Sequence, residues 1–106
     1  MEKFFKNDSR LGIPVPDLDR EWEWEAYPAE VQDRILLHWE NIRGSIPDRI
    51  VDLEKIINKK QSQLEDEQDF KKSCCLNSEI AELASVINEL WLWYRTSQDV
   101  TGKIHL

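Results

Sequence analysis

The spacing of apolar residues in the second half of the chain constrains the fold more than any other feature. From residue 46, isoleucine and leucine recur at steps of four, three, four and seven, as Ile46, Ile50, Leu53, Ile57 and Leu64. This spacing places them on one side of an α-helix and is typical of an antiparallel coiled-coil seam. The sequence therefore predicts a helix over 45–66, in which Lys60 takes the place of one apolar seam residue.

A second apolar stripe follows an acidic turn and predicts an antiparallel helical hairpin. Asp69 is a suitable N-cap, because its carboxylate can accept an amide hydrogen bond and faces the positive end of the helix dipole. The predicted helix covers 69–96, and its stripe comprises Phe70, Cys74, Asn77, Ile80, Leu83 or Ala84, Ile87, Leu90 or Trp91, and Tyr94. At 1.5 Å per residue it spans on the order of 40 Å, against roughly 30 Å for 45–66. Its aromatic end is therefore expected to overhang its partner.

A further helix is predicted over 28–43. Pro28 suits a first helical turn and Gly44 suits a stop, while SIPD at 45–48 has the form of a capping box that starts the next helix. One face of this helix carries Val31, Ile35, His38, Trp39 and Ile42. The expected fold class is all-α and resembles a three-helix bundle. Either this helix or a second chain covers the apolar stripe of the hairpin.

The remaining segments are expected to be irregular parts of the same single domain, 1–106. Residues 1–27 are predicted to be an extended arm, because Pro14 and Pro16 fix their own backbone dihedrals and favour extended neighbours. The stretch EWEWEAY alternates Glu with Trp22 and Trp24 and is predicted to lie across the helices. Residues 97–106 are predicted to be a loose tail.

Charge and hydropathy argue against nucleic acids and membranes as partners. The 106-residue chain has a net charge of −7, whereas nucleic-acid affinity comes largely from lysine and arginine. Its apolar runs are far shorter than the roughly 20 residues that cross a bilayer. The opening MEKFFKNDSR lacks the apolar core of a secretory signal, so a cytoplasmic location is expected. Cys74 and Cys75 are adjacent and are expected to be reduced thiols.

Residues 50–84 resemble the UVR motif, a helical hairpin of the excision-repair proteins UvrB and UvrC and of some Clp-type ATPases and their adaptors. The matching positions are Leu53, Leu64, Asp69, Phe70, Ser73, Cys74, Leu76, Ile80 and Leu83. Two charged features differ: Lys71 replaces an acidic residue, and Asn77-Ser78 replaces an Arg-Asp pair. The resemblance implies a hairpin that associates with other hairpins or helices, without the charge pattern that suits the usual partners of that family.

Catalytic and metal sites are not expected. His38 and His105 lie in separate segments, away from the two cysteines, and no nucleophile motif is present. No cofactor is predicted. The alternative is a metal-dependent nucleotide hydrolase similar to the all-α MazG-like pyrophosphatases, with Mg²⁺ held by Glu54, Glu79, Glu82 and Glu89.

The predicted function is a non-enzymatic protein interaction module or small regulator in the bacterial cytoplasm. It would bind a protein partner or a second copy of itself as a homo-oligomer. Five tryptophans are many for a chain of this size, and aromatic residues dominate binding hot spots. The candidate contact residues are Phe70, Trp22, Trp24, Trp91, Trp93 and Tyr94. For Phe70 a structural role is the alternative, in which the ring closes the end of the hairpin against Leu64.

Overall fold

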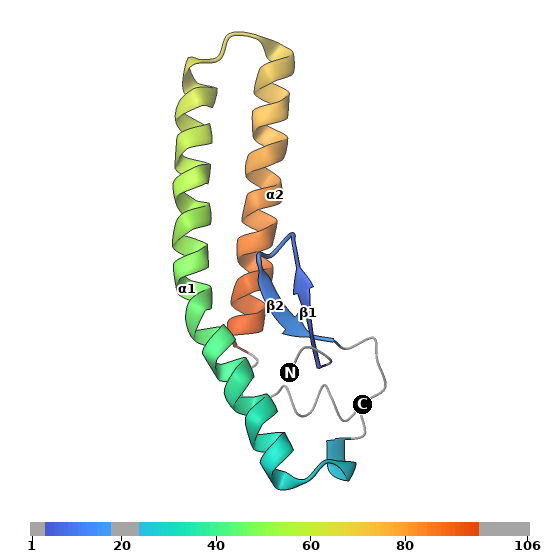
Figure 1. Ribbon diagram of the computed structural model, residues 1–106. Helices are drawn as coiled ribbons and strands as arrows, with labels where there is room; N and C mark the ends of the chain where they lie inside the picture. Colours follow the sequence, from blue (N-terminus) through green and yellow to red (C-terminus); the bar gives the residue numbers. More distant parts are fainter. Residues whose placement is uncertain (1–3, 18–23, 96–106) are drawn as a thin grey trace.

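Two long antiparallel helices and a small β-hairpin make up the structure, a computed structural model that describes residues 4–17 and 24–95 (Figure 1). Its elements in chain order are β1 (Phe5–Asp8), β2 (Ile13–Pro16), a short 3-10 helix (Trp24–Ala26), α1 (Ala29–Asp66) and α2 (Phe70–Tyr94). The molecule is elongated, with a longest dimension of 60 Å. The helical hairpin is confirmed, whereas the separate N-terminal helix and the three-helix bundle are not.

The prediction of two helices over 28–43 and 45–66 is wrong, because α1 continues through this region without a break. Gly44 does not adopt a positive φ, and Ser45 does not act as an N-cap. The Ser45 hydroxyl instead donates a hydrogen bond of 2.6 Å to the carbonyl of Ile42 in the preceding turn. The start and stop signals of the sequence are therefore overridden within the helix.

Burial explains why the helix continues. Ile42, Ile46 and Ile50 are four residues apart and are all buried, so the apolar stripe passes through Gly44 without a change of phase. Pro47 lacks an N–H and cannot donate to the carbonyl four residues earlier. Figure 1 shows α1 bending in this region, as is expected where a proline removes one helical hydrogen bond.

The turn between the helices has the predicted cap. The Asp69 side chain accepts a hydrogen bond of 3.2 Å from the Lys72 amide, which confirms Asp69 as the N-cap of α2. The side chain of Glu67 accepts a second bond from the Asp69 amide. These two bonds satisfy backbone donors that the helix itself leaves free.

The N-terminal segment is a β-hairpin rather than an extended arm over the whole of 1–27. Strands β1 and β2 are antiparallel, with Phe5 opposite Pro16 and Asp8 opposite Ile13. The Asp8 carboxylate accepts a hydrogen bond from the Leu11 amide, and the Asp8 carbonyl accepts one of 2.7 Å from the Gly12 amide. Gly12 has a φ of 77°, a conformation that glycine adopts without strain. The turn chemistry thus closes a hairpin of two four-residue strands.

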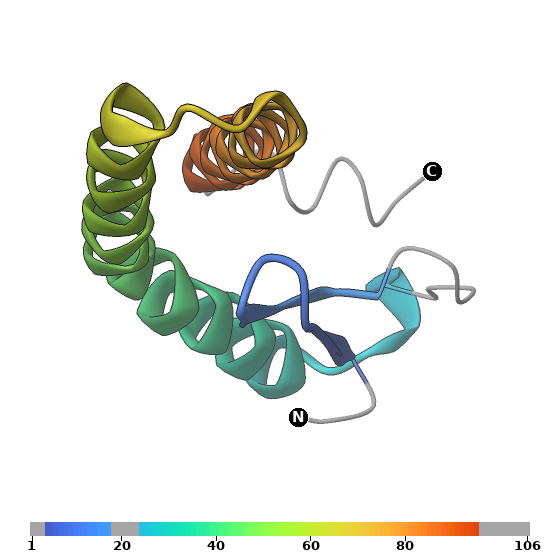
Figure 2. The ribbon, with the colours of Figure 1, turned by 90° about the horizontal axis from the view of Figure 1, so that it is seen from above.

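The buried core lies at one end of the molecule, where the β-hairpin and the end of α2 pack on the first half of α1 (Figure 2). Trp39 is at its centre, 1% exposed, with its ring stacked on Phe5 and edge-to-face with Trp93. Other fully buried side chains include Leu11, Ile13, Val15, Ile35, Ile46, Ile50, Leu53, Val86 and Leu90. We call this region the proximal core.

Candidate interaction surface on the distal half of the hairpin

The far half of the helical hairpin lacks a buried core. From residue 54 to residue 85, which we call the distal arm, no side chain is fully buried. The apolar residues that face the partner helix, including Ile57, Leu64 and Ile80, are only half-buried. Two helices alone cannot enclose their apolar stripes, so this part of the molecule leaves the apolar residues of the seam partly exposed.

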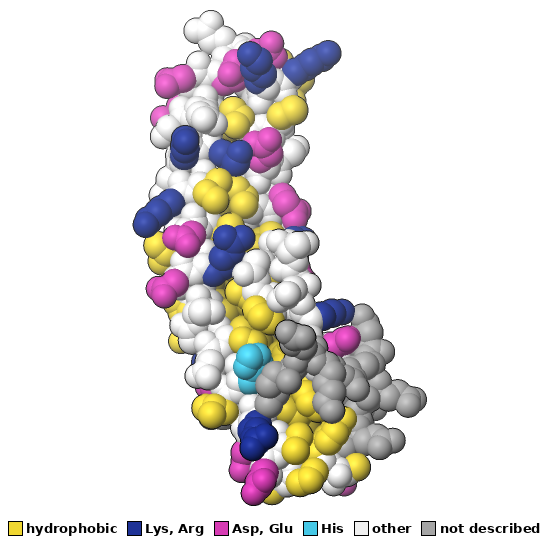
Figure 3. Space-filling model, in the orientation of Figure 1, with side chains coloured by type: hydrophobic (Ala, Val, Ile, Leu, Met, Phe, Trp, Pro, Cys, Tyr) yellow, Lys and Arg dark blue, Asp and Glu magenta, His cyan; other side chains and the backbone are white. Residues whose placement is uncertain are grey.

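A groove runs along one face of the distal arm, between the two helices. Two adjoining hollows of about 620 and 390 Å³ meet at Glu79. The first is lined by Gln63, Asp66, Glu67, Lys71, Lys72, Cys75, Leu76 and Glu79, and the second by Ile56, Lys60, Ser78, Glu79, Glu82 and Leu83. Figure 3 shows hydrophobic side chains along the middle of the hairpin, with charged side chains beside them. We call this surface the distal groove.

Charges of opposite sign are separated along each side of the distal groove. Lys60 of α1 and Glu79 of α2 form an ion pair of 2.7 Å across the groove. Nearer the turn, α1 ends at Asp66 and is followed by Glu67, and α2 carries Lys71 and Lys72. Lys71 and Lys72 form no ion pair with any described residue, so they are available to carboxylates of a partner.

The β-hairpin closes the proximal end of the groove. Arg10, at its turn, donates to Glu82 at 2.6 Å and also pairs with Glu89, while its third contact is the Ser85 hydroxyl at 3.1 Å. The hydrogen bond to Glu82 is the largest cause, and that to Glu89 the next, of a pKa of the Arg10 guanidinium above its ordinary value. On the other side of the turn, Arg49 of α1 donates to the Leu11 carbonyl at 3.0 Å. Arg10 therefore attaches the turn of the β-hairpin to α2, and Arg49 attaches it to α1.

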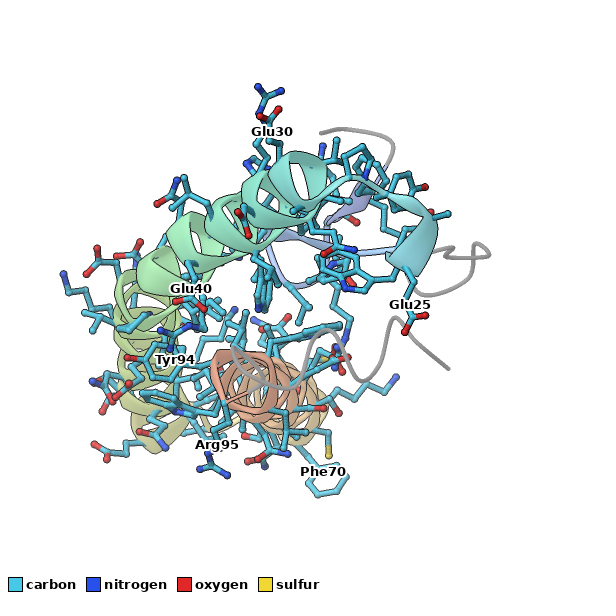
Figure 4. The ribbon with its side chains drawn as sticks, turned by 90° about the horizontal axis from the view of Figure 1, so that it is seen from below. Glu25, Glu30, Glu40, Phe70, Tyr94 and Arg95 are labelled. Carbon is cyan, nitrogen blue, oxygen red and sulfur yellow. The ribbon has the colours of Figure 1, made fainter. Side chains whose placement is uncertain are left out.

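The structural role predicted for Phe70 is wrong. Its side chain is 82% exposed and does not close the end of the hairpin against Leu64. Figure 4 shows the ring pointing outward from the start of α2, on the side away from the β-hairpin. An exposed aromatic ring at a hairpin tip fits the partner contact that the sequence suggested, but it lies outside the distal groove.

The other aromatic candidates divide between the core and the surface. Trp24 is 7% exposed and belongs to the proximal core, and Trp93 packs on Trp39 with ring centroids 5.5 Å apart. Trp91 is 37% exposed and lies edge-to-face on Tyr94. Trp22 lies outside the described residues. The end of α2 therefore does not overhang, because the continuous α1 extends beside it.

Tyr94 is held by an arginine of α1. The Arg43 guanidinium lies 4.9 Å from the centre of the Tyr94 ring and donates to the Tyr94 carbonyl at 3.3 Å. Arg43 also pairs with Glu40 at 2.8 Å, and chiefly this hydrogen bond raises the pKa of the guanidinium. Tyr94 is thus part of the packing between the two helices, as Figure 4 illustrates.

Three of the four glutamates of the hydrolase alternative are engaged by cations. Glu79 pairs with Lys60, and Arg10 holds Glu82 and Glu89. Within 4–17 and 24–95, no group of three or more histidine, cysteine or acidic side chains is arranged to hold a metal ion. Cys74 and Cys75 are both exposed free thiols, and only Cys75 lines the groove.

No helix among the described residues is long and apolar enough to cross a membrane. Comparison of the chain with protein-family models, curated proteins and solved structures found no match.

None of the residues that line or close the distal groove was among the predicted aromatic contacts. Arg10 closes the groove, but its partners are more than 70 residues away in the chain and no local pattern indicates them. Ile56 is 41% exposed in the groove. Ile56 is next to the seam residue Ile57. Because a strict seam needs only one of these two isoleucines, the second indicated an apolar side chain outside the seam.

Proposed function

We propose that the protein is a non-enzymatic interaction module or small regulator that binds another protein chain through the distal arm of its helical hairpin. The observation that carries the proposal is the absence of any fully buried side chain from 54 to 85, in a hairpin that still presents apolar residues along its length. Exposed apolar patches of this kind are typical of protein-binding surfaces.

The shape of the hairpin supports the same proposal. A helical groove with apolar residues in the middle and charges at the rim suits a helix or helical hairpin as partner. The UVR-like positions of 50–84 point to the same kind of partner by resemblance. The proximal core supplies a fixed base, since it anchors both helices through Trp39 and the β-hairpin.

The proposal can be tested with variants of Ile56 and Phe70, the two large apolar side chains of the arm that are exposed. We would immobilise the wild-type protein, the double variant Ile56→Lys/Phe70→Ser, and the control Gln61→Lys, which introduces a charge at an exposed position outside the groove. We expect the wild type and the control to bind a protein chain, either self or foreign, in a native lysate. We expect the double variant to lose this binding while its melting temperature stays unchanged.

Quantitative mass spectrometry of the recovered proteins and light scattering of the purified chain provide the readouts. Equal recovery by all three proteins, or a strictly monomeric wild type that recovers nothing, would contradict the proposal.

A further inference from the structure

We infer that the occupant of the distal groove is a second copy of this chain, arranged antiparallel so that the two distal arms form a four-helix bundle. This inference rests on the proposed function and specifies its partner. The observations that carry it are the charge balance of the groove, the positions of its charges along the two helices, and the place of the β-hairpin.

The groove is nearly neutral, although the chain is not. Its lining contains three lysines, Lys60, Lys71 and Lys72, against four carboxylates, one of which, Glu82, is already paired with Arg10. The whole chain has a net charge of −7, so most other acidic surfaces of two copies repel each other. The distal groove is a face on which two copies can meet without that repulsion.

The charges of the groove are also self-complementary in an antiparallel arrangement. On α2, lysines lie near the turn and Glu82 lies farther from it. On the α1 side the order is reversed, with Glu67, the residue that follows α1, near the turn and Lys60 farther away. When a second copy is rotated end over end onto the groove, Lys71 of each copy comes to Glu82 of the other, whose carboxylate also accepts from Arg10. Lys60, which is paired with Glu79 in its own copy, comes to Glu67.

One two-fold axis serves both sets of pairs. On α2 the midpoint between Lys71 and Glu82 falls between Leu76 and Asn77, and on α1 the midpoint between Lys60 and Glu67 falls between Gln63 and Leu64. The Lys60–Glu79 ion pair fixes the relative level of the two helices. Counted from this pair toward the turn, the two midpoints differ by one residue, or about 1.5 Å along the axis. In a two-fold symmetric dimer the same surface of both copies forms the interface, so both midpoints must lie at the level of the one symmetry axis.

The β-hairpin excludes the parallel alternative on this face. Its turn stands at the proximal end of the groove, where Arg10 contacts Glu82, Ser85 and Glu89. Two copies placed side by side in the same direction would bring both β-hairpins to the same position. In the antiparallel arrangement each β-hairpin instead faces the tip of the other copy. The stretch of α2 between Lys71 and Glu82, where the contacts with the β-hairpin begin, spans on the order of 16 Å.

The first test is the association of the purified full chain, measured by sedimentation equilibrium over a concentration series. We expect a reversible dimer for the wild type and for the control Gln61→Lys. Ile56→Lys places a charge in the groove and should raise the dissociation constant more than about tenfold. Circular dichroism of each variant checks that the fold is kept, which is expected because Ile56 is partly exposed.

The second test uses the native thiols to establish the geometry. Cys75 lines the groove about one and a half residues from the proposed axis, whereas Cys74 does not line it. A short bismaleimide should therefore join two copies of Cys74→Ser through Cys75. It should fail to join two copies of Cys75→Ser.

The outcomes separate this inference from the proposed function. A wild type that is monomeric at every concentration, or a dimer joined through Cys74, overturns the antiparallel dimer. If such a monomer still binds a foreign protein and Ile56→Lys abolishes that binding, the interaction module stands and only its partner changes. If the double variant Ile56→Lys/Phe70→Ser also retains all binding, both are overturned.

Discussion

The proximal core and the distal arm are built from the same two helices, yet they differ in what covers them. In the proximal core, α1 is packed against the β-hairpin and the end of α2, and side chains such as Trp39, Ile46 and Leu90 are nearly inaccessible. In the distal arm the same helix packs on α2 alone among the described elements, and Ile57 and Leu64 stay half-buried. The comparison shows that the two-helix seam buries its apolar side chains fully only where a third layer covers it.

The difference between the two regions predicts where mutations unfold the protein and where they affect only binding. Substitutions in the proximal core should lower the free energy of unfolding by several kcal/mol. Substitutions in the distal arm should have small effects on folding. The following variants, ordered by expected effect, test this division.

Trp39→Ala should have the largest effect, a loss of about 3–5 kcal/mol in the free energy of unfolding, because it empties the centre of the proximal core. Urea denaturation followed by circular dichroism measures it. Trp91→Ala is the matched control: its ring is partly exposed, and its loss should cost only about 1 kcal/mol. Similar losses for the two variants would show that the core is not centred on Trp39.

Ile50→Ala and Ile57→Ala compare the two regions at the same residue type on one helix. Ile50 is fully buried, so its substitution should lower the free energy of unfolding by about 2–5 kcal/mol. Ile57 is half-buried, and its substitution should lower it by about 1 kcal/mol. Denaturation should be measured at low protein concentration, so that association does not add to stability. An equal cost at both positions would mean that the distal arm is covered even in the isolated chain.

Asp69→Ala should cost about 1 kcal/mol, because it removes the acceptor that the Lys72 amide uses at the start of α2. Asp69→Asn should retain most of the stability, since asparagine also caps helices well. Amide hydrogen exchange at Lys72 provides a local readout alongside denaturation. Unchanged exchange in Asp69→Ala would argue that the cap is dispensable.

Phe70→Ala should have the smallest effect on folding, within about 0.5 kcal/mol, because the ring is almost fully exposed. Thermal unfolding of this variant beside the wild type is the measurement. A loss of several kcal/mol would restore the structural role that the sequence suggested, in which Phe70 closes the hairpin.

The helical hairpin was predictable because its signals are periodic and long. The seam from Ile46 to Leu64, the stripe from Phe70 to Tyr94 and the cap at Asp69 each follow from repeated spacing or from side-chain chemistry. The face formed by Ile35, Trp39 and Ile42 was predicted correctly for the same reason, and all three are buried.

The break at Gly44 and the extended arm were not predicted correctly, because local signals competed with tertiary packing. Gly44, Ser45 and Pro47 favour a helix end, but the isoleucine stripe on either side is buried only if the helix continues. The strands of the β-hairpin have four residues each, and β2 contains two prolines, so their pattern is too short to predict a strand.

For the interaction surface, composition indicated that aromatic residues matter but not where they lie. Trp24 and Trp93 are used in the core, Phe70 is exposed, and Trp91 lies between these extremes. Their distribution depends on contacts between segments far apart in the chain, of which the groove formed by α1, α2 and Arg10 is the clearest case. Helical spacing alone does not determine such contacts.

The contacts of Arg10 with α2 also have a consequence for the order in which the chain folds. Arg10 and Glu89 are separated by 79 positions, so this end of the molecule can close only after nearly all of α2 has left the ribosome. The ends of α1 and α2 next to the turn at 67–69 are close in sequence, so they can pair earlier. Until the last turns of α2 emerge, Trp39 and its neighbours are exposed to the surrounding cell, and that interval is when a nascent chain is most prone to aggregate.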